Sequence, residues 1–162
     1  MTHYIIDGNN LIGKIESLKK LHKKGKQLSR VKLSFMMERY FSKRKALVGL
    51  FFDGFENEKI NVSGIRIYYS ESLTADEKIK KEIERSSNPK SIILITSDRN
   101  LLEFAKACSC TTIKCEEIVK QLNSAIKTDE EQVKIAELNN IEEFKKLFGV
   151  NQTTAEATKK NS

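Results

Sequence analysis

The chain has 162 residues, which suits one domain with a sizeable core and leaves too little length for two full domains. Its 29 Lys and Arg side chains against 22 Asp and Glu give a net charge of +7, which favours a polyanionic partner. The sequence has no apolar run of about 18 residues and no signal-peptide pattern at its N-terminus, so we expect a soluble cytoplasmic protein that contacts no membrane. Cys108, Cys110 and Cys115 have no flanking His, which predicts plain thiols and neither a disulfide framework nor a zinc site.

Short apolar runs alternate with amphipathic stretches along the chain, as is typical of a parallel sheet with crossover helices. We predict strands at 3–7, 46–53, 65–69, 91–96 and 111–114. We predict helices at 27–44, 75–86, from Asp98 to about 107, 115–126 and 129–148. The expected fold class is α/β, a three-layer α/β/α sandwich with a mainly parallel central sheet of about five strands.

No Gly- or Ser-rich linker and no internal repeat divides the chain. Residues 1–150 are therefore expected to form a single domain. Residues 151–162, with the sequence NQTTAEATKKNS, have nothing to bury, so we expect a disordered polar tail there.

Four of the five aspartates lie where a predicted strand ends or a helix begins. Asp7 and Asp53 end two strands, Asp98 follows another, and Asp76 opens the helix after the third strand. Because the carboxyl ends of parallel strands share one edge of a sheet, we expect these four carboxylates to converge. They would repel one another unless a hard divalent cation neutralised them, and Mg²⁺ or Mn²⁺ fits a set of oxygen ligands.

Each of these aspartates also has a purely structural explanation. Two of them begin Asp-Gly turn dipeptides, at 7–8 and 53–54. Asp76 suits the first turn of a helix, and Asp98 is a potential N-cap. Nevertheless, four of the five aspartates occupy such positions, whereas the glutamates lie elsewhere in the sequence. This joint pattern favours the metal site.

Residues 8–14, GNNLIGK, resemble the phosphate-binding loop G-x-x-x-x-G-K that follows a first strand. The Ser or Thr that would hold magnesium is replaced by Ile15, which disfavours an NTPase. We expect Asn9 and Asn10 to hydrogen-bond to metal-bound carboxylates or to the substrate.

Four motifs occur in order: YIIDGNNL at 4–11, FFDG at 51–54, TADEKI at 74–79 and ITSDR at 95–99. Together they resemble the motifs of the NYN superfamily of PIN-like ribonucleases, and especially its YacP-like branch. The resemblance extends over most of the predicted folded part of the chain. It implies an α/β/α fold in which clustered acidic residues hold one or two Mg²⁺ or Mn²⁺ ions for RNA cleavage.

Carried over position by position, the resemblance implicates an acidic centre and two neighbours that orient it: Asp7, Asp53, Asp76 and Asp98, with Asn9 and Ser97. We favour Asp7 and Asp98 as direct ligands, with the other two aspartates binding a second ion or acting through water. Asn9 is expected to position a ligand or phosphate, and Ser97 to hydrogen-bond Asp7 or a metal-bound water. The YacP-like branch includes a ribosome-associated endoribonuclease that cuts messenger RNA during translation, so this substrate and this partner are implied.

The positive charge is concentrated in residues 14–45, which hold 12 Lys and Arg and two acids. Such a segment suits contact with an RNA backbone and predicts salt-sensitive binding. Its alternative interpretation is a solvated helix face with an exposed lysine-rich loop at 19–26. The residues expected to contact RNA are Lys14, Lys19, Lys20, Lys23, Lys24, Lys26, Arg30 and Arg99.

These observations predict a metal-dependent endoribonuclease. A first alternative is a non-catalytic RNA- or ribosome-binding module with a residual acidic site, which would bind RNA without regard to divalent metal. A second is a receiver-like domain phosphorylated on Asp53, but the acidic pair usual after the first strand is absent, since Gly8-Asn9 follows Asp7.

Overall fold

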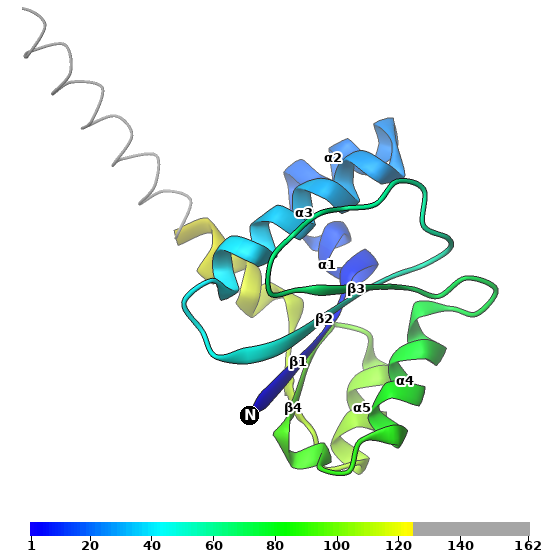
Figure 1. Cartoon of the computed structure of the whole chain (residues 1–162), viewed down its shortest axis with the longest axis vertical. Helices are drawn as coiled ribbons and strands as arrows, with labels where there is room; N and C mark the ends of the chain where they lie inside the picture. Colours follow the sequence, from blue (N-terminus) through cyan, green and yellow to red (C-terminus); the bar gives the residue numbers. More distant parts are fainter. Residues whose placement is uncertain (125–162) are drawn as a thin grey trace, which may run out of the picture. The chain divides into compact units, whose positions relative to one another are not determined.

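The computed structural model describes residues 1–124, and at its centre lies a five-stranded parallel sheet (Figure 1). The strands lie in the order β3-β2-β1-β4-β5. Their bounds are Thr2–Asp7 for β1, Ala46–Phe52 for β2, Arg66–Tyr69 for β3, Ile92–Ile95 for β4 and Thr111–Ile113 for β5. The predicted α/β fold class with a parallel sheet is confirmed, and each strand lies where the apolar runs placed it.

Helices cover both faces of this sheet. Figure 1 shows α1, α2 and α3 on one side and α4 and α5 on the other, which gives the predicted three layers. Their bounds are Gly8–Lys14 for α1, Glu16–Lys24 for α2, Lys26–Phe41 for α3, Ala75–Arg85 for α4 and Arg99–Ala107 for α5. A 3-10 turn, η1, spans Pro89–Ser91, and a further helix begins at Cys115 and continues to the last described residue.

The core has two halves because successive strand residues point to opposite faces of the sheet. Ile5 and Phe51 lie in a buried cluster with Ile79 of α4 and Leu101 of α5. The alternate residues are covered by α1 and α3, as the ring contact between Tyr4 and Phe41 shows. Burying each large apolar side chain of this kind stabilises the fold by about 1.5–3 kcal/mol.

The segment between β1 and α3 differs from the sequence-based prediction. Residues 8–14, interpreted above as a loop, form α1, which starts directly after β1 with Asp7 as its N-cap. Most of the lysine-rich stretch 19–26, considered as an exposed loop, is helical and belongs to α2. Both helices escaped prediction because they are short, with seven and nine residues, and because Gly-Asn and lysine-rich composition favours a loop at these places.

The turn from β1 into α1 requires a glycine. A Cβ on Gly8 would lie 2.6 Å from the carbonyl oxygen of Phe51 and 2.7 Å from the ring of Phe52. Only a residue without a side chain lets α1 begin this close to β2. The close approach places Asn9 and Asn10 above the ends of the neighbouring strands.

Residues Met1–Gln121 form one compact unit, and a second unit begins at Leu122. The predicted helix at 129–148, the domain end at 150 and the predicted tail at 151–162 lie outside the described residues and stay predictions. Among the helices of residues 1–124, none has the length and apolar character needed to cross a bilayer.

Candidate functional site

Asp7 is a buried acid at the carboxyl edge of the sheet. It ends β1, is 9% exposed, and lies between the ends of β2 and β4. Its Oδ2 accepts a 2.9 Å hydrogen bond from the Thr96 hydroxyl, and its Oδ1 accepts a 3.5 Å bond from the backbone N–H of Asn10. Burial raises the pKa of Asp7 to about 6 despite these bonds, and the charges of Asp53 and Asp76 add to the shift.

Asp53 and Asp76 both lie at the N-terminal end of α4. Asp53 follows β2, and its Oδ1 accepts a 2.7 Å hydrogen bond from the backbone N–H of Ala75, the first residue of α4. The Oδ2 of Asp76 pairs with Lys80 at 3.2 Å, whereas its Oδ1 is buried and has no hydrogen-bond partner. A buried carboxylate oxygen without a partner is costly, so this atom has a free place for a ligand.

Asp98 lies at the same edge but has a separate structural task. Its Oδ1 caps α5 by accepting a 2.9 Å hydrogen bond from the backbone N–H of Leu101, and the residue is exposed. Its own N–H donates to the Thr96 hydroxyl at 3.1 Å. Asp53 and Asp76, and not Asp98, are the carboxylates whose charges raise the pKa of Asp7. Of the other three predicted acids, Asp53 and Asp76 therefore lie near enough to Asp7 for their charges to act on it, and a metal-ligand role for any of the four stays a prediction.

The two asparagines of the first motif tie the ends of three strands together. The Oδ1 of Asn9 accepts a 2.8 Å hydrogen bond from the backbone N–H of Asp53. The Oδ1 of Asn10 accepts bonds from the Ser97 N–H at 2.8 Å and from the Cys115 thiol at 3.2 Å. The amide oxygen of Asn9 therefore holds the Asp53 backbone, and a role of Asn9 in positioning a ligand or phosphate stays a prediction.

Thr96, and not Ser97, donates the hydrogen bond to Asp7. Ser97 instead donates to the Glu116 carboxylate at 2.6 Å and accepts from the Cys115 N–H at 3.0 Å. The sequence analysis missed Thr96 as a neighbour of Asp7. The strand register was the missing signal, because Ile6 pairs with Ile95 and the next residues along each strand are therefore Asp7 and Thr96.

The three cysteines are free, as predicted, and Cys110 and Cys115 are buried. Burial raises the pKa of Cys115 to about 12. It therefore remains a neutral thiol and serves as the hydrogen-bond donor to Asn10.

The model of the YacP-like NYN domain matches residues 4–160 of the sequence. The chain belongs to the YacP-like NYN domain family. This family has a nuclease-like fold associated with RNA. No match was found among curated proteins.

Two solved structures of Rae1 (YacP) from Bacillus subtilis share the fold of this NYN domain. A mutant form aligns with a TM-score of 0.67 at 23% identity, covering 84% of each chain. A second Rae1 structure aligns with a TM-score of 0.63 at 23% identity, covering 92% of this chain and 93% of the other.

NYN nucleases generally use divalent metal ions. Asp7, Asp53 and Asp76 offer the carboxylate oxygens that hard cations prefer, and one oxygen of Asp76 lacks any partner. Within residues 1–124, no three His, Cys, Asp or Glu side chains form a group that could hold a metal ion by themselves. Magnesium does not require three protein ligands, because it keeps several waters and commonly uses one or two carboxylates together with substrate phosphates.

The residues predicted to contact RNA, apart from Arg30, fall into two groups. The first is exposed, lies on α2 and at the start of α3, and is called the basic helix surface below: Lys19, Lys20, Lys23, Lys24 and Lys26. The second is engaged in exposed ion pairs: Lys14 with Glu116 at 3.4 Å, and Arg99 with Glu103 at 3.5 Å. Such pairs are weak and leave both cations accessible to a polyanion.

Arg30 is the exception among the predicted RNA-contacting residues, because it is 4% exposed. Its guanidinium donates to the carbonyl oxygens of Phe55, at 2.9 Å, and of Asp53. It also lies over the rings of Phe52 and Tyr69, 5.6 and 5.2 Å from their centroids. The prediction for Arg30 is therefore corrected: its donors hold the loop after β2 and are not presented to RNA.

Proposed function

We propose that this NYN domain is a metal-dependent endoribonuclease that hydrolyses RNA phosphodiester bonds with Mg²⁺ or Mn²⁺. The observation that carries the proposal is the grouping of Asp7, Asp53 and Asp76, in which burial and neighbouring charge raise the pKa of Asp7 and one oxygen of Asp76 is left without a partner. A site of like charges that is costly to the empty protein is what an ion-binding centre is expected to show.

Hydrolysis of a phosphodiester needs an activated water and neutralisation of charge on the phosphate, and a divalent cation supplies both when bound. Asp7, Asp53 and Asp76 are the residues that would hold it. Thr96 orients the Asp7 carboxylate through its 2.9 Å hydrogen bond. Asn9 and Arg30 fix the Asp53 backbone from two sides, so the second carboxylate has a defined position.

RNA flanking the cleaved bond would lie against the basic helix surface. Lysine ammonium groups bind phosphates without reading sequence, so this surface supplies affinity and little base preference. We further propose that the substrate is messenger RNA in the cytoplasm and that the ribosome is the partner. Membership of the YacP-like family supports this finer assignment.

The test compares Asp7→Asn and Asp76→Asn with the matched control Glu103→Gln, which alters an exposed acid on α5. We expect the two aspartate variants to fold and to lose Mn²⁺-dependent cleavage of a labelled RNA, while the control cleaves as the unaltered protein does. Undiminished cleavage by the Asp7→Asn, Asp76→Asn double variant would refute the proposal.

Asp98→Asn examines the fourth acid, because asparagine is as good an N-cap as aspartate and preserves α5. Lost cleavage in this variant would assign Asp98 to the centre, and retained cleavage would limit the centre to the three grouped acids. If RNA binds equally well in EDTA and no product forms with either cation, the chain is instead a non-catalytic RNA- or ribosome-binding module.

A further inference from the structure

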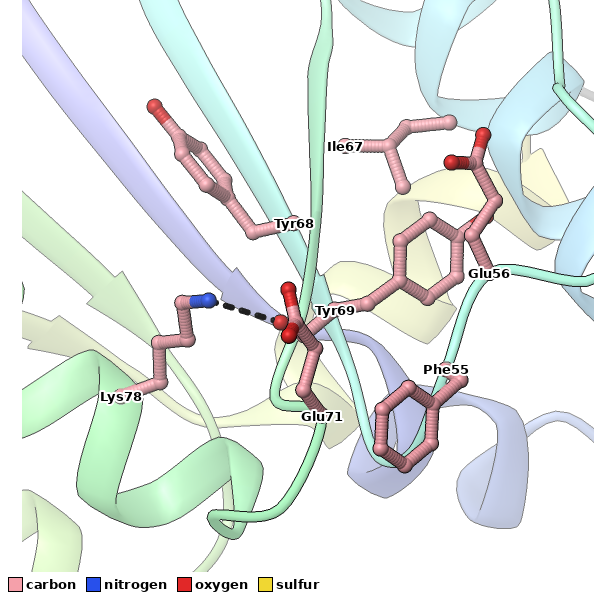
Figure 2. A pocket seen from close by; sticks show the side chains of 7 residues that line it. All are labelled: Phe55, Glu56, Ile67, Tyr68, Tyr69, Glu71 and Lys78. Carbon is pink, nitrogen blue, oxygen red and sulfur yellow. Dashed lines mark hydrogen bonds between the residues drawn. The ribbon is translucent and has the colours of Figure 1, made fainter.

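A pocket of about 390 Å³ opens beside the end of β3 (Figure 2). Its walls include the rings of Phe55 and Tyr69, the carboxylates of Glu56 and Glu71, and the amine of Lys78. In Figure 2 the Glu71 carboxylate lies between Lys78 and the two rings. The combination of aromatic surface with hydrogen-bonding groups is typical of pockets that bind planar polar molecules.

Two loops that hydrogen-bond to each other shape this pocket. The backbone N–H of Glu71 donates to the Gly54 carbonyl at 2.8 Å, and the Gly54 N–H donates to the Ser70 hydroxyl at 2.9 Å. Glu71 has a φ of 58°, a left-handed conformation that few residues other than glycine adopt. A strained residue that lines a pocket is an observation from which function can be inferred.

The aromatic and polar groups of the pocket have unused capacity. Phe55 is 64% exposed although it is a large apolar side chain. The hydroxyl of Tyr69 is buried and has no hydrogen-bond partner. Lys78 donates to the Tyr69 carbonyl at 2.8 Å, which leaves further N–H donors on the same ammonium. A ligand that stacks on a ring and forms hydrogen bonds would use the exposed Phe55 ring and the remaining Lys78 donors.

The pocket adjoins the acidic centre through the chain itself. Phe55 lies two residues after Asp53, whereas Lys78, two residues after Asp76 on α4, points to a different side of that helix. The Arg30 guanidinium donates to the carbonyls of both Asp53 and Phe55, so one side chain holds the centre and the pocket wall together. A nucleotide next to a phosphate at the acids is therefore placed to reach the pocket.

We propose that this pocket is a base-binding subsite for single-stranded RNA that prefers guanine, an inference that rests on the proposed function. The base stacks on Phe55, and its Watson–Crick edge faces the Glu71 carboxylate. Guanine is the base that presents two adjacent N–H donors, N1–H and N2–H₂, on that edge, and a carboxylate accepts both. Adenine, cytosine and uracil have no second adjacent donor on that edge, so one carboxylate oxygen would face a base acceptor, which it repels.

The experiment measures binding of the intact protein, in EDTA, to fluorescent oligouridines that carry one central guanosine, inosine or adenosine. We expect tighter binding of the guanosine RNA than of the adenosine RNA, with inosine between them because it lacks the N2 amine. Phe55→Ala is expected to weaken binding of the guanosine RNA about tenfold, the effect of removing one stacking platform. Glu71→Gln is expected to abolish the guanosine preference and leave the affinity for plain oligouridine unchanged.

Two matched controls keep the test specific to the pocket. Leu47→Ala removes another exposed apolar side chain, from the opposite end of β2, and Glu117→Gln alters an exposed acid far along the chain. Both are expected to retain the guanosine preference. Equal affinities for the guanosine and adenosine RNAs, an unaltered preference in Glu71→Gln, or the absence of measurable binding would overturn the subsite.

Failure of the subsite and failure of the proposed function give different results. Guanosine-selective binding without cleavage in Mn²⁺ would refute the nuclease activity and support the base subsite. Cleavage that is unaffected by both Phe55→Ala and Glu71→Gln would support the nuclease activity and refute the subsite.

Discussion

Thr96 donates a 2.9 Å hydrogen bond to the Asp7 carboxylate across the neighbouring strand ends of β4 and β1. The same hydroxyl accepts from the backbone N–H of Asp98 at 3.1 Å, and Asp98 in turn caps α5. One fully buried side chain thus joins the central acid to the start of the next helix. This arrangement makes the ionisation of Asp7 sensitive to a residue that carries no charge.

We predict that Asp7→Asn stabilises the metal-free protein at neutral pH. Burial raises the pKa of Asp7 from its ordinary 3.8 to about 6, so the folded protein binds this proton more tightly than the unfolded chain does. The free energy of unfolding of the unaltered protein therefore falls as pH rises from about 4 to about 6, and the loss is complete above that range. The shift corresponds to about 2–3 kcal/mol.

Urea denaturation in EDTA at pH 4 and pH 7 measures this effect. Asparagine preserves the cap of α1, so the variant should exceed the unaltered protein in stability at pH 7 and not at pH 4. A variant that is less stable at pH 7 would show that the Asp7 carboxylate is not penalised by burial. Added Mn²⁺ should raise the melting temperature of the unaltered protein and leave that of the variant unchanged.

A second prediction concerns Thr96→Val. The Thr96 hydrogen bond lowers the pKa of Asp7, so its loss should raise that pKa further and move the onset of Mn²⁺-dependent cleavage to higher pH. The variant also leaves the Asp98 N–H without its partner, at a cost of about 1–3 kcal/mol. Thr96→Ser should restore the pH profile, and Thr112→Val on β5 serves as the control. If the pH profile of cleavage by Thr96→Val is unshifted, Thr96 does not position the Asp7 carboxylate.

A third prediction separates the basic helix surface from Arg30. Replacing Lys23 and Lys24 by Gln should weaken RNA binding and reduce the slope of log affinity against log salt by about 0.7 for each phosphate that the protein no longer neutralises. The control is Lys81→Gln, an exposed lysine on α4. Filter binding across a salt series gives the slopes, and equal slopes for the double variant and the unaltered protein would contradict RNA binding at α2.

A fourth prediction is that Arg30→Lys loses stability and cleavage but keeps the salt dependence of RNA binding. Lysine cannot hold both the Asp53 and Phe55 carbonyls or cover the two rings, so the buried donors and acceptors lose partners at about 2–4 kcal/mol. Cleavage falls because the Asp53 backbone is then held by Asn9 alone. The matched change Arg85→Lys at the end of α4 should affect neither quantity. If Arg30→Lys reduces the slope of log affinity against log salt, Arg30 contacts RNA after all.

The sheet was predictable because its signals are local. Most strands are short runs rich in β-branched, aromatic or other apolar residues, and the capping box at Thr74 and Glu77 marks the start of α4, as the structure shows. The same local rules failed at 8–26, because the DGNN motif has the composition of a turn while a buried contact of Gly8 with β2 starts a helix there. Local composition does not report such a contact between distant residues.

The residue pattern was enough to predict which carboxylates share an edge of the sheet, because Asp7, Asp53 and Asp76 each lie beside the end of a parallel strand or the start of the helix that follows. The hydrogen-bond partners of these carboxylates depend on the tertiary structure. The register of β1 and β4 makes Thr96, rather than Ser97, the hydrogen-bond partner of Asp7. The guanidinium of Arg30, which its charge alone would place at the surface, is buried. These contacts join residues that are far apart in the sequence, so they form only after the strands have paired.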